Sequence, residues 1–232
     1  MEINLVVDKD MMEYQINNAG DEYKEALLHY GFEEKNHLLI KSYNKNTFMY
    51  AQDKEMLEKN FRSCLQEVVN HTLGKTTMDW EKSLEVIACR MEKNNIKWWL
   101  AGSAACAIRG INIIPKDIDV MTYKTEIKKI EKGFKDTTIE PFHYVTDWFV
   151  KGFGVVYLKG RVDIAFEPEE SSDADQKVDF GCYAMNNLEV VEWKGYSIYV
   201  PPVELHIYPN KARGRNDRVK KIEEYMKHNL KT

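Results

Sequence analysis

The sequence predicts an α+β protein with enough apolar material for a packed core. Trp80, Leu84, Ile87 and Met91 recur at the spacing of one helix face, whereas short apolar segments such as 96–101 end at turn residues and indicate strands. The 232 residues include 44% hydrophobic residues but only 12 Gly and 6 Pro, which excludes collagen-like, low-complexity and wholly disordered proteins. This length corresponds to one large domain or two small ones.

Residues 1–75 are expected to form an α/β accessory segment that carries no chemical motif. Turns at Gly31 and 44–46 separate its expected elements, which are a strand at 3–7, a helix at about 10–30, short strands at 37–42 and 47–51, and a helix at about 53–71. Gly74-Lys75-Thr76 is similar to the end of a phosphate-binding loop. Val69 stands where such a loop needs its first glycine, so we interpret this segment as a linker.

Residues 77–232 form the second expected unit. Thr77 or Asp79 begins the amphipathic helix, a buried strand at 96–101 follows, and a short helix at 104–109 ends at Gly110, which suits a left-handed C-cap. The remaining expected elements are a strand at 117–122, a helix at 124–135, a hairpin of 153–158 and 161–166, strands at 188–193 and 197–200, and a helical tail from about residue 203 with helices at 203–208 and 217–229.

Composition also limits location and partners. No apolar run approaches the roughly 18 residues of a membrane span, and charged residues follow the first methionine closely, so neither a membrane partner nor a signal peptide is expected. The four cysteines are widely spaced, which favours reduced thiols in a cytoplasmic protein over a zinc ribbon or a disulfide framework. The net charge of −4 argues against a general nucleic-acid coat, although residues 203–232 contain eight Lys and Arg against four Asp and Glu.

Two carboxylates separated by one residue indicate a metal site. On a strand, Asp117 and Asp119 point to one face while Ile118 and Val120 point into the core. Such close like charges repel each other unless a divalent cation lies between them, and oxygen ligands favour magnesium or manganese. An acid-x-acid pattern is expected about six times by chance in a chain with 37 acidic residues, so the context must decide.

A third carboxylate occurs on a later strand. In the expected strand at 161–166, Asp163 emerges on the face opposite the apolar residues. If this strand neighbours the one at 117–122, Asp163 joins Asp117 and Asp119. The alternatives are a solvated side chain and an ion pair with Arg161.

The turn at Gly102-Ser103 offers a complementary anion site. Because it joins a strand to a helix, its free backbone N–H groups and the Ser103 hydroxyl are suited to bind phosphate. The alternative is a plain turn in which Ser103 caps the helix.

In this order, Gly102-Ser103, Asp117-Ile118-Asp119 and Asp163 resemble the nucleotidyltransferase superfamily typified by DNA polymerase beta. The segments 98–103 and 115–120 look especially similar to its small bacterial branch, which includes lincosamide, aminoglycoside and toxin-type nucleotidyltransferases. The resemblance covers about residues 79–229. It implies a nucleotidyltransferase-like mixed sheet flanked by helices.

The resemblance also implies roles for the motif residues. Asp117 and Asp119 would hold Mg²⁺ or Mn²⁺ on a nucleoside triphosphate, and Gly102-Ser103 would hold its phosphates. Asp163 would complete the metal site and activate the acceptor hydroxyl. We therefore expect magnesium-dependent transfer of a nucleoside monophosphate to a hydroxyl, with release of pyrophosphate.

Basic residues are candidate contacts for the triphosphate. Lys211, Arg213 and Arg215, followed by Asp217, resemble the basic segment that often follows the catalytic domain in the lincosamide-type branch. A solvated helix face is the alternative for these residues. Lys116, beside the first aspartate, either contacts a phosphate or balances local charge.

The acceptor stays open between a small molecule such as an antibiotic, a tRNA end, a protein hydroxyl and a second nucleotide. The aromatic run at 141–153, with Trp148 and Phe149, either lines an acceptor or base pocket or packs in the core. Alternative functions are a toxin or binding module that binds an antitoxin-like partner through residues 1–75, and a glycosyltransferase that binds metal through its Asp-x-Asp pair. A homodimer is a further possible assembly. The glycosyltransferase does not account for Gly102-Ser103 or Asp163.

Overall fold

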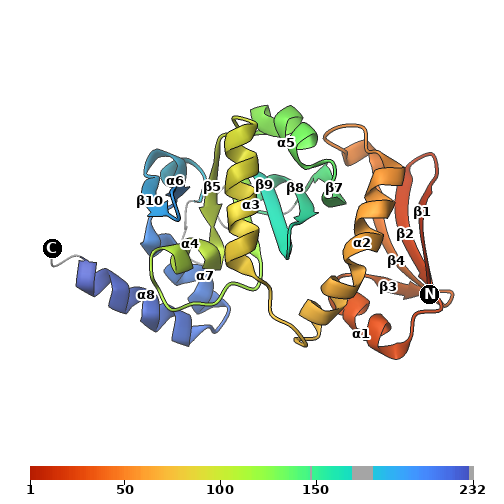
Figure 1. Cartoon of the computed structure of the whole chain (residues 1–232), viewed down its shortest axis with the longest axis horizontal. Helices are drawn as coiled ribbons and strands as arrows, with labels where there is room; N and C mark the ends of the chain where they lie inside the picture. Colours follow the sequence, from red (N-terminus) through yellow and green to blue (C-terminus); the bar gives the residue numbers. More distant parts are fainter. Residues whose placement is uncertain (147, 169–179, 230–232) are drawn as a thin grey trace.

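The computed structural model describes residues 1–146, 148–168 and 180–229, which form the α+β fold that the sequence predicts (Figure 1). Within these residues the strands make a four-stranded sheet of order β1-β2-β4-β3, a five-stranded sheet of order β5-β6-β9-β8-β7, and the hairpin β10-β11. Figure 1 shows the four-stranded sheet at one end of the molecule, the five-stranded sheet in the middle and the C-terminal helices at the other end.

The N-terminal unit is an antiparallel sheet covered by two helices. The strands are β1 (Glu2–Val7), β2 (Met11–Asn17), β3 (Glu33–Lys35) and β4 (Leu38–Asn44). The helices α1 (Asp21–His29) and α2 (Lys54–Thr72) bury apolar side chains against this sheet. Asp53 begins α2 as its N-cap, accepting a hydrogen bond from the Met56 N–H at 3.0 Å.

Two predicted elements of this unit are wrong. The helix expected at about 10–30 is a strand followed by a shorter helix, because Met12, Tyr14 and Ile16 alternate as buried residues and so follow the strand period. The strand expected at 47–51 is absent from the described residues. A short 3₁₀ helix, η1 (Lys45–Thr47), stands there instead, followed by a single bridge from Phe48 to the central sheet.

The five-stranded central sheet is mixed. Its strands are β5 (Trp98–Ala101), β6 (Ile118–Thr122), β7 (Thr138–Tyr144), β8 (Val150–Tyr157) and β9 (Arg161–Pro168). The β6–β9 pair is parallel and every other pair is antiparallel. The edge strand β7 is not expected from the sequence: Pro141, which cannot donate to a ladder, lies inside it, where the register with β8 shifts.

Helices cover one face of the central sheet. The helices α3 (Trp80–Lys93) and α5 (Ile127–Phe134), the latter preceded by the short 3₁₀ helix η2 (Lys124–Glu126), pack on it. Ile118, Val120 and Ile164 point into this core, so Asp119 and Asp163 point to the opposite face. On that face, Ile139 and Val155 pack into the core of the N-terminal unit, and the remainder faces the C-terminal segment.

The C-terminal segment contains α6 (Cys182–Asn186), β10 (Glu189–Trp193), β11 (Tyr196–Val200), η3 (Val203–His206), α7 (Ile207–Ala212) and α8 (Asn216–Asn229). Ile222 of α8 is fully buried in a cluster with Cys106 of α4 (Gly102–Ile108). This contact holds the start of α8 beside the end of β5. Among the described residues, no helix combines the length and apolar character needed to cross a membrane.

Candidate active site

The central sheet brings two of the predicted carboxylates into register. Because β6 and β9 are parallel neighbours, Asp119 lies directly opposite Asp163. Asp117 lies just before β6, two residues from Asp119 and on the same side of the chain. The condition on which the three-carboxylate prediction depended, adjacency of the two strands, is therefore met.

The electrostatics of this group disfavour three bare negative charges. Burial, followed by repulsion from Asp117 and Asp163, raises the pKa of Asp119 to about 8. Burial also raises the pKa of Asp163 to about 6, although Arg161 opposes the shift. A cation placed at Asp117 and Asp119 would relieve this repulsion, so the residues present fit a divalent cation with oxygen ligands.

Asp163 does not point toward such a cation. Its Oδ1 accepts a hydrogen bond from Arg161 Nε at 2.6 Å, and its side chain does not line the cavity described below. Within the described ranges, no three Asp, Glu, His or Cys side chains are grouped so that they could hold one metal ion. The structure therefore shows the alternative role of Asp163, an ion pair with Arg161.

Gly102 lies against the Asp119 carboxylate. A Cβ at this position would lie 1.8 Å from Asp119 Oδ2, far inside any permitted contact, and the φ angle of Gly102 is +59°. Only glycine satisfies both requirements. The prediction that a glycine ends β5 beside the aspartates thus has a steric basis.

Ser103 faces the cavity but does not cap the helix. The helix α4 begins at Gly102, two residues earlier than a helix capped by Ser103 would begin, and its N-cap, Ala101, has no side-chain hydrogen bond. The alternative in which Ser103 is the N-cap is therefore not the one that the structure shows. At the other end, Gly110 adopts the predicted left-handed conformation, with φ of +86°.

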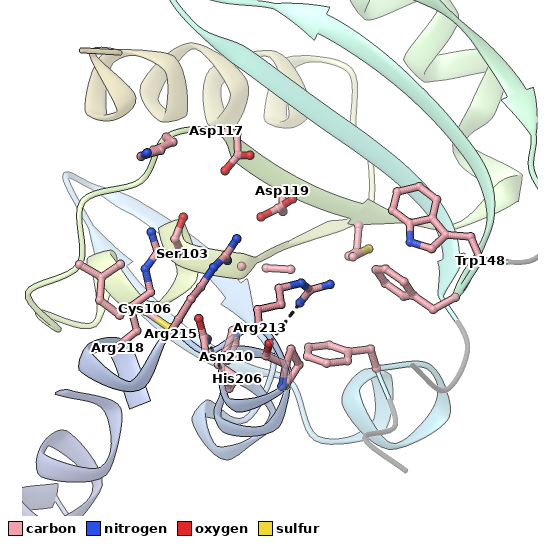
Figure 2. A pocket seen from close by; sticks show the side chains of 18 residues that line it. Ser103, Cys106, Asp117, Asp119, Trp148, His206, Asn210, Arg213, Arg215 and Arg218 are labelled. Atoms are coloured by element: carbon pink, nitrogen blue, oxygen red, sulfur yellow. Dashed lines mark hydrogen bonds between the residues drawn. The ribbon is translucent and has the colours of Figure 1, made fainter. Parts of the chain in front are cut away.

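A cavity of about 300 Å³ opens beside these residues (Figure 2). One wall carries the Gly102-Ser103 turn with Asp117 and Asp119. The opposite wall is basic and comes from the C-terminal segment, from which Arg215 reaches toward the aspartates in Figure 2, while Arg213 Nη1 donates to the Pro209 carbonyl oxygen at 3.5 Å. The third wall is aromatic and consists of Trp148, Phe149 and Phe180.

The cavity lining carries several positive charges. Lys116, Arg215 and Arg218 line the cavity, and none of them forms an ion pair within the part of the chain that the structure describes. Arg213 also lines it and is close enough to Asp119 to oppose the rise of its pKa. Unneutralised cations beside a carboxylate pair create a site for a metal-bound polyanion.

Lys211 lies outside this arrangement. It does not line the cavity, and its Nζ lies 3.5 Å from Glu223 on α8. Of the predicted phosphate contacts, the structure therefore brings Gly102, Ser103, Lys116 and Arg215 together and leaves Lys211 apart.

Arg218 and His206 are cavity residues that the motif comparison did not identify. Arg218 follows Arg215 by one helical turn, so a search for basic residues at i and i+3 would have found it. His206 has no comparable sequence signal. Of the predicted aromatic run, Trp148 and Phe149 line the cavity, whereas Phe142 is fully buried in the core.

His206 makes stability dependent on pH. It is 4% exposed, its Nδ1 lies 3.3 Å from the Val203 carbonyl oxygen, and its Nε2 has no partner among the described residues. Burial lowers its pKa to about 4. Since the folded pKa is lower than the unfolded one, near 6.5, the unfolded state takes up the proton first as the pH falls.

We expect the contribution of neutral His206 to the free energy of unfolding to be complete above about pH 6.5. Below that pH it should fall, and by pH 5 the protein should have lost about 2 kcal/mol of stability through this residue alone. Urea unfolding at pH 7.5 and 5.0 gives, for wild type and for His206→Gln, the loss of unfolding free energy between the two pH values. The loss should be larger in wild type, and an equal loss in both proteins would contradict the prediction.

Comparisons with known proteins give likenesses of fold. No family model matches the chain, and no curated protein matches it in sequence. Among solved structures it is similar to a candidate nucleotidyltransferase from Thermotoga maritima, with 21% identity over 66% of this chain and 94% of that one and a TM-score of 0.48. It is also similar to the lincomycin-bound lincosamide antibiotic adenylyltransferase LnuA, with 13% identity over 62% and 97% of the two chains and a TM-score of 0.44.

A further similar structure is the antibiotic-resistance factor ANT(2'')-Ia, with 10% identity over 63% of this chain and 82% of that one and a TM-score of 0.44. At such identities and TM-scores the likeness assigns no activity, which has to be argued from the site itself.

Proposed function

We propose that this protein transfers a nucleoside monophosphate from a nucleoside triphosphate to a hydroxyl acceptor and releases pyrophosphate, with Mg²⁺ or Mn²⁺ as its cofactor. One observation carries the proposal. The carboxylates of Asp117 and Asp119 and the cations of Lys116, Arg215 and Arg218 line a single cavity. A metal-bound triphosphate complements both groups.

The chain's own residues would act by positioning and by charge. Asp117 and Asp119 would hold the cation, and Asp163 would complete its ligands after leaving Arg161. Ser103 would donate its hydroxyl to a phosphate oxygen. When bound, the cation would neutralise charge on the triphosphate and on the attacking and leaving oxygens.

The basic wall would bind the leaving pyrophosphate. Guanidinium groups at Arg215 and Arg218 match phosphate geometry with paired N–H donors, and their charge would stabilise the charge that develops as the α-phosphate bond breaks. The aromatic wall of Trp148, Phe149 and Phe180 offers flat surfaces for a nucleobase or a ring-containing acceptor. In this proposal residues 77–232 are the catalytic unit, with a helical tail from about 203, and residues 1–75 are an accessory unit.

Binding of the triphosphate tests the basic wall. Arg218→Gln should weaken binding of a magnesium nucleoside triphosphate by about tenfold, because it removes one charge-assisted contact. Isothermal titration with each of the four common magnesium ribonucleoside triphosphates measures the affinity and identifies the donor. Lys227→Gln is the matched control, since Lys227 lies on the same helix without lining the cavity.

Two outcomes would contradict the proposed site. One is a wild-type protein that binds none of the four magnesium triphosphates. The other is an equal loss of affinity in Arg218→Gln and Lys227→Gln, which would assign the effect to general charge. Incubation with each labelled triphosphate and a host extract then identifies the acceptor as the species that acquires the label.

A further inference from the structure

A chain of charged groups connects the N-terminal unit to Asp163. Glu140 on β7 is 3% exposed, and its carboxylate accepts hydrogen bonds from Lys41 Nζ and from the Tyr43 hydroxyl, each at 2.8 Å. Arg161 Nη1 lies 3.4 Å from the same Glu140 oxygen that Lys41 contacts. Arg161 Nε in turn donates to Asp163 Oδ1 at 2.6 Å. The chain begins on β4 and ends beside Asp119.

Lys41 and Arg161 share one oxygen of Glu140. Both cations lie over the ring of Tyr30, with Lys41 Nζ at 4.7 Å and the Arg161 guanidinium carbon at 5.0 Å from its centroid. Burial alone would raise the pKa of Glu140, but the charges of Lys41 and Arg161 lower it below the usual value. One buried, ionised carboxylate therefore pairs with two half-buried cations, and burial of the carboxylate strengthens these electrostatic interactions.

Arg161 bridges two acceptors, and its closer contact is with Asp163 at 2.6 Å, against 3.4 Å to Glu140. While Arg161 holds Asp163 Oδ1, the Asp163 side chain does not line the cavity. If Arg161 moves closer to Glu140 and gives up its bond to Asp163, Asp163 becomes available to a cation at Asp117 and Asp119. A divalent charge at that position would favour this second arrangement.

We propose that Arg161 is a positioning residue that withholds Asp163 until a cation binds, and that Lys41 of the N-terminal unit sets the cation affinity by competing with Arg161 for Glu140. The inference rests on the proposed function and deepens it by giving residues 1–75 a role in the metal site. It requires no contact between those residues and the cavity.

Two remote substitutions should change the affinity for Mn²⁺ in opposite directions. Lys41→Met leaves Glu140 to Arg161, releases Asp163 and should tighten Mn²⁺ binding about fivefold or more. Glu140→Gln removes the charge that draws Arg161 away, keeps Asp163 paired and should weaken binding by a similar factor. Electron paramagnetic resonance of free Mn²⁺ titrated with the full-length, nucleotide-free protein measures both changes.

Measuring the same two substitutions in an Asp163→Asn protein separates the release of Asp163 by Arg161, which we call the exchange, from simple Coulomb effects on the cation. Removing a distant positive or negative charge shifts cation affinity with the same signs, but that effect would persist without Asp163. Exchange requires Asp163, so both shifts should disappear when Lys41→Met or Glu140→Gln is combined with Asp163→Asn. Lys24→Met is the matched lysine control, because Lys24 pairs with Glu34 at 2.8 Å on the exposed surface of the same unit.

The outcomes distinguish this inference from the proposed function. If Asp119→Asn loses Mn²⁺ binding, the metal site stands. The proposed role of Arg161 and Lys41 would then be overturned if Lys41→Met left Mn²⁺ affinity unchanged or lowered it. It would also be overturned if Lys41→Met tightened Mn²⁺ binding equally in the Asp163→Asn background. A wild type that binds no Mn²⁺, or an Asp119→Asn protein that binds it equally well, would overturn both. If Glu140→Gln fails to fold, Lys41→Met still decides, through tightening that is present in the wild-type background and absent in the Asp163→Asn background, because structural damage does not tighten a site.

Discussion

Asp119→Asn is expected to lower the rate of nucleotidyl transfer by about a thousandfold or more, while the protein stays folded. The substitution keeps the size of the side chain that lies against Gly102 and removes only its charge. Transfer of label from the triphosphate that wild type binds measures the rate. Asp10→Asn, at an exposed carboxylate of the N-terminal unit, is the matched control and should transfer at the wild-type rate.

The same variant should be at least as stable as wild type at neutral pH. The folded pKa of Asp119, about 8, lies above the ordinary aspartate pKa of 3.8, so ionising this residue destabilises the metal-free fold increasingly as the pH rises through that interval. Asparagine carries no such penalty. Unchanged transfer by Asp119→Asn, or equal binding of a magnesium triphosphate by wild type and Asp117→Asn/Asp119→Asn, would remove these aspartates from the site.

Gly102→Ala is expected to reduce transfer by about a hundredfold or more. Its Cβ would occupy the position of Asp119 Oδ2, and displacing a catalytic group by about 1 Å commonly has an effect of that size. The positive φ adds about 1 kcal/mol of backbone strain. Transfer assays and thermal melting measure the two effects separately.

Gly110→Ala provides the matched control for backbone strain. Gly110 follows the other end of the same helix with φ of +86°, and no atom lies within 4 Å of an added Cβ. This variant should also be less stable by about 1 kcal/mol, but its transfer rate should stay within about twofold of wild type. If both variants lose activity equally, strain rather than displacement of Asp119 explains the loss.

Local patterns in the chain predict the centre of the fold well. The helix α3 follows from apolar residues at helical spacing, and β6 and β9 follow from apolar residues that alternate with aspartates. The same reasoning fails at 10–30, where a strand and a helix follow each other within 20 residues. A turn at Asn18, which has φ of +52°, separates them, and its Asn and Gly neighbours were the available signal.

The identities of the basic residues in the cavity depend on packing between distant segments. Lys211, Arg215 and Arg218 look equivalent in the sequence, yet only the two arginines line the cavity. Lys211 lies on α7 and Arg215 just before α8, whereas Arg218 lies on α8, whose rotation is set by the buried contact of Ile222 with the cluster around Cys106. Such a rotation is set by contacts across more than 100 residues, which local spacing does not encode.

The sequence by itself determined the α+β class, the strand-borne carboxylates and the glycine that ends β5, because alternation along a strand and the turn that ends it are local properties. Only the tertiary structure decided that Asp163 pairs with Arg161 and that Arg161 shares Glu140 with Lys41. Ion-pair partners are chosen among all charges that the fold brings within reach, and here those charges come from β4, β7 and β9.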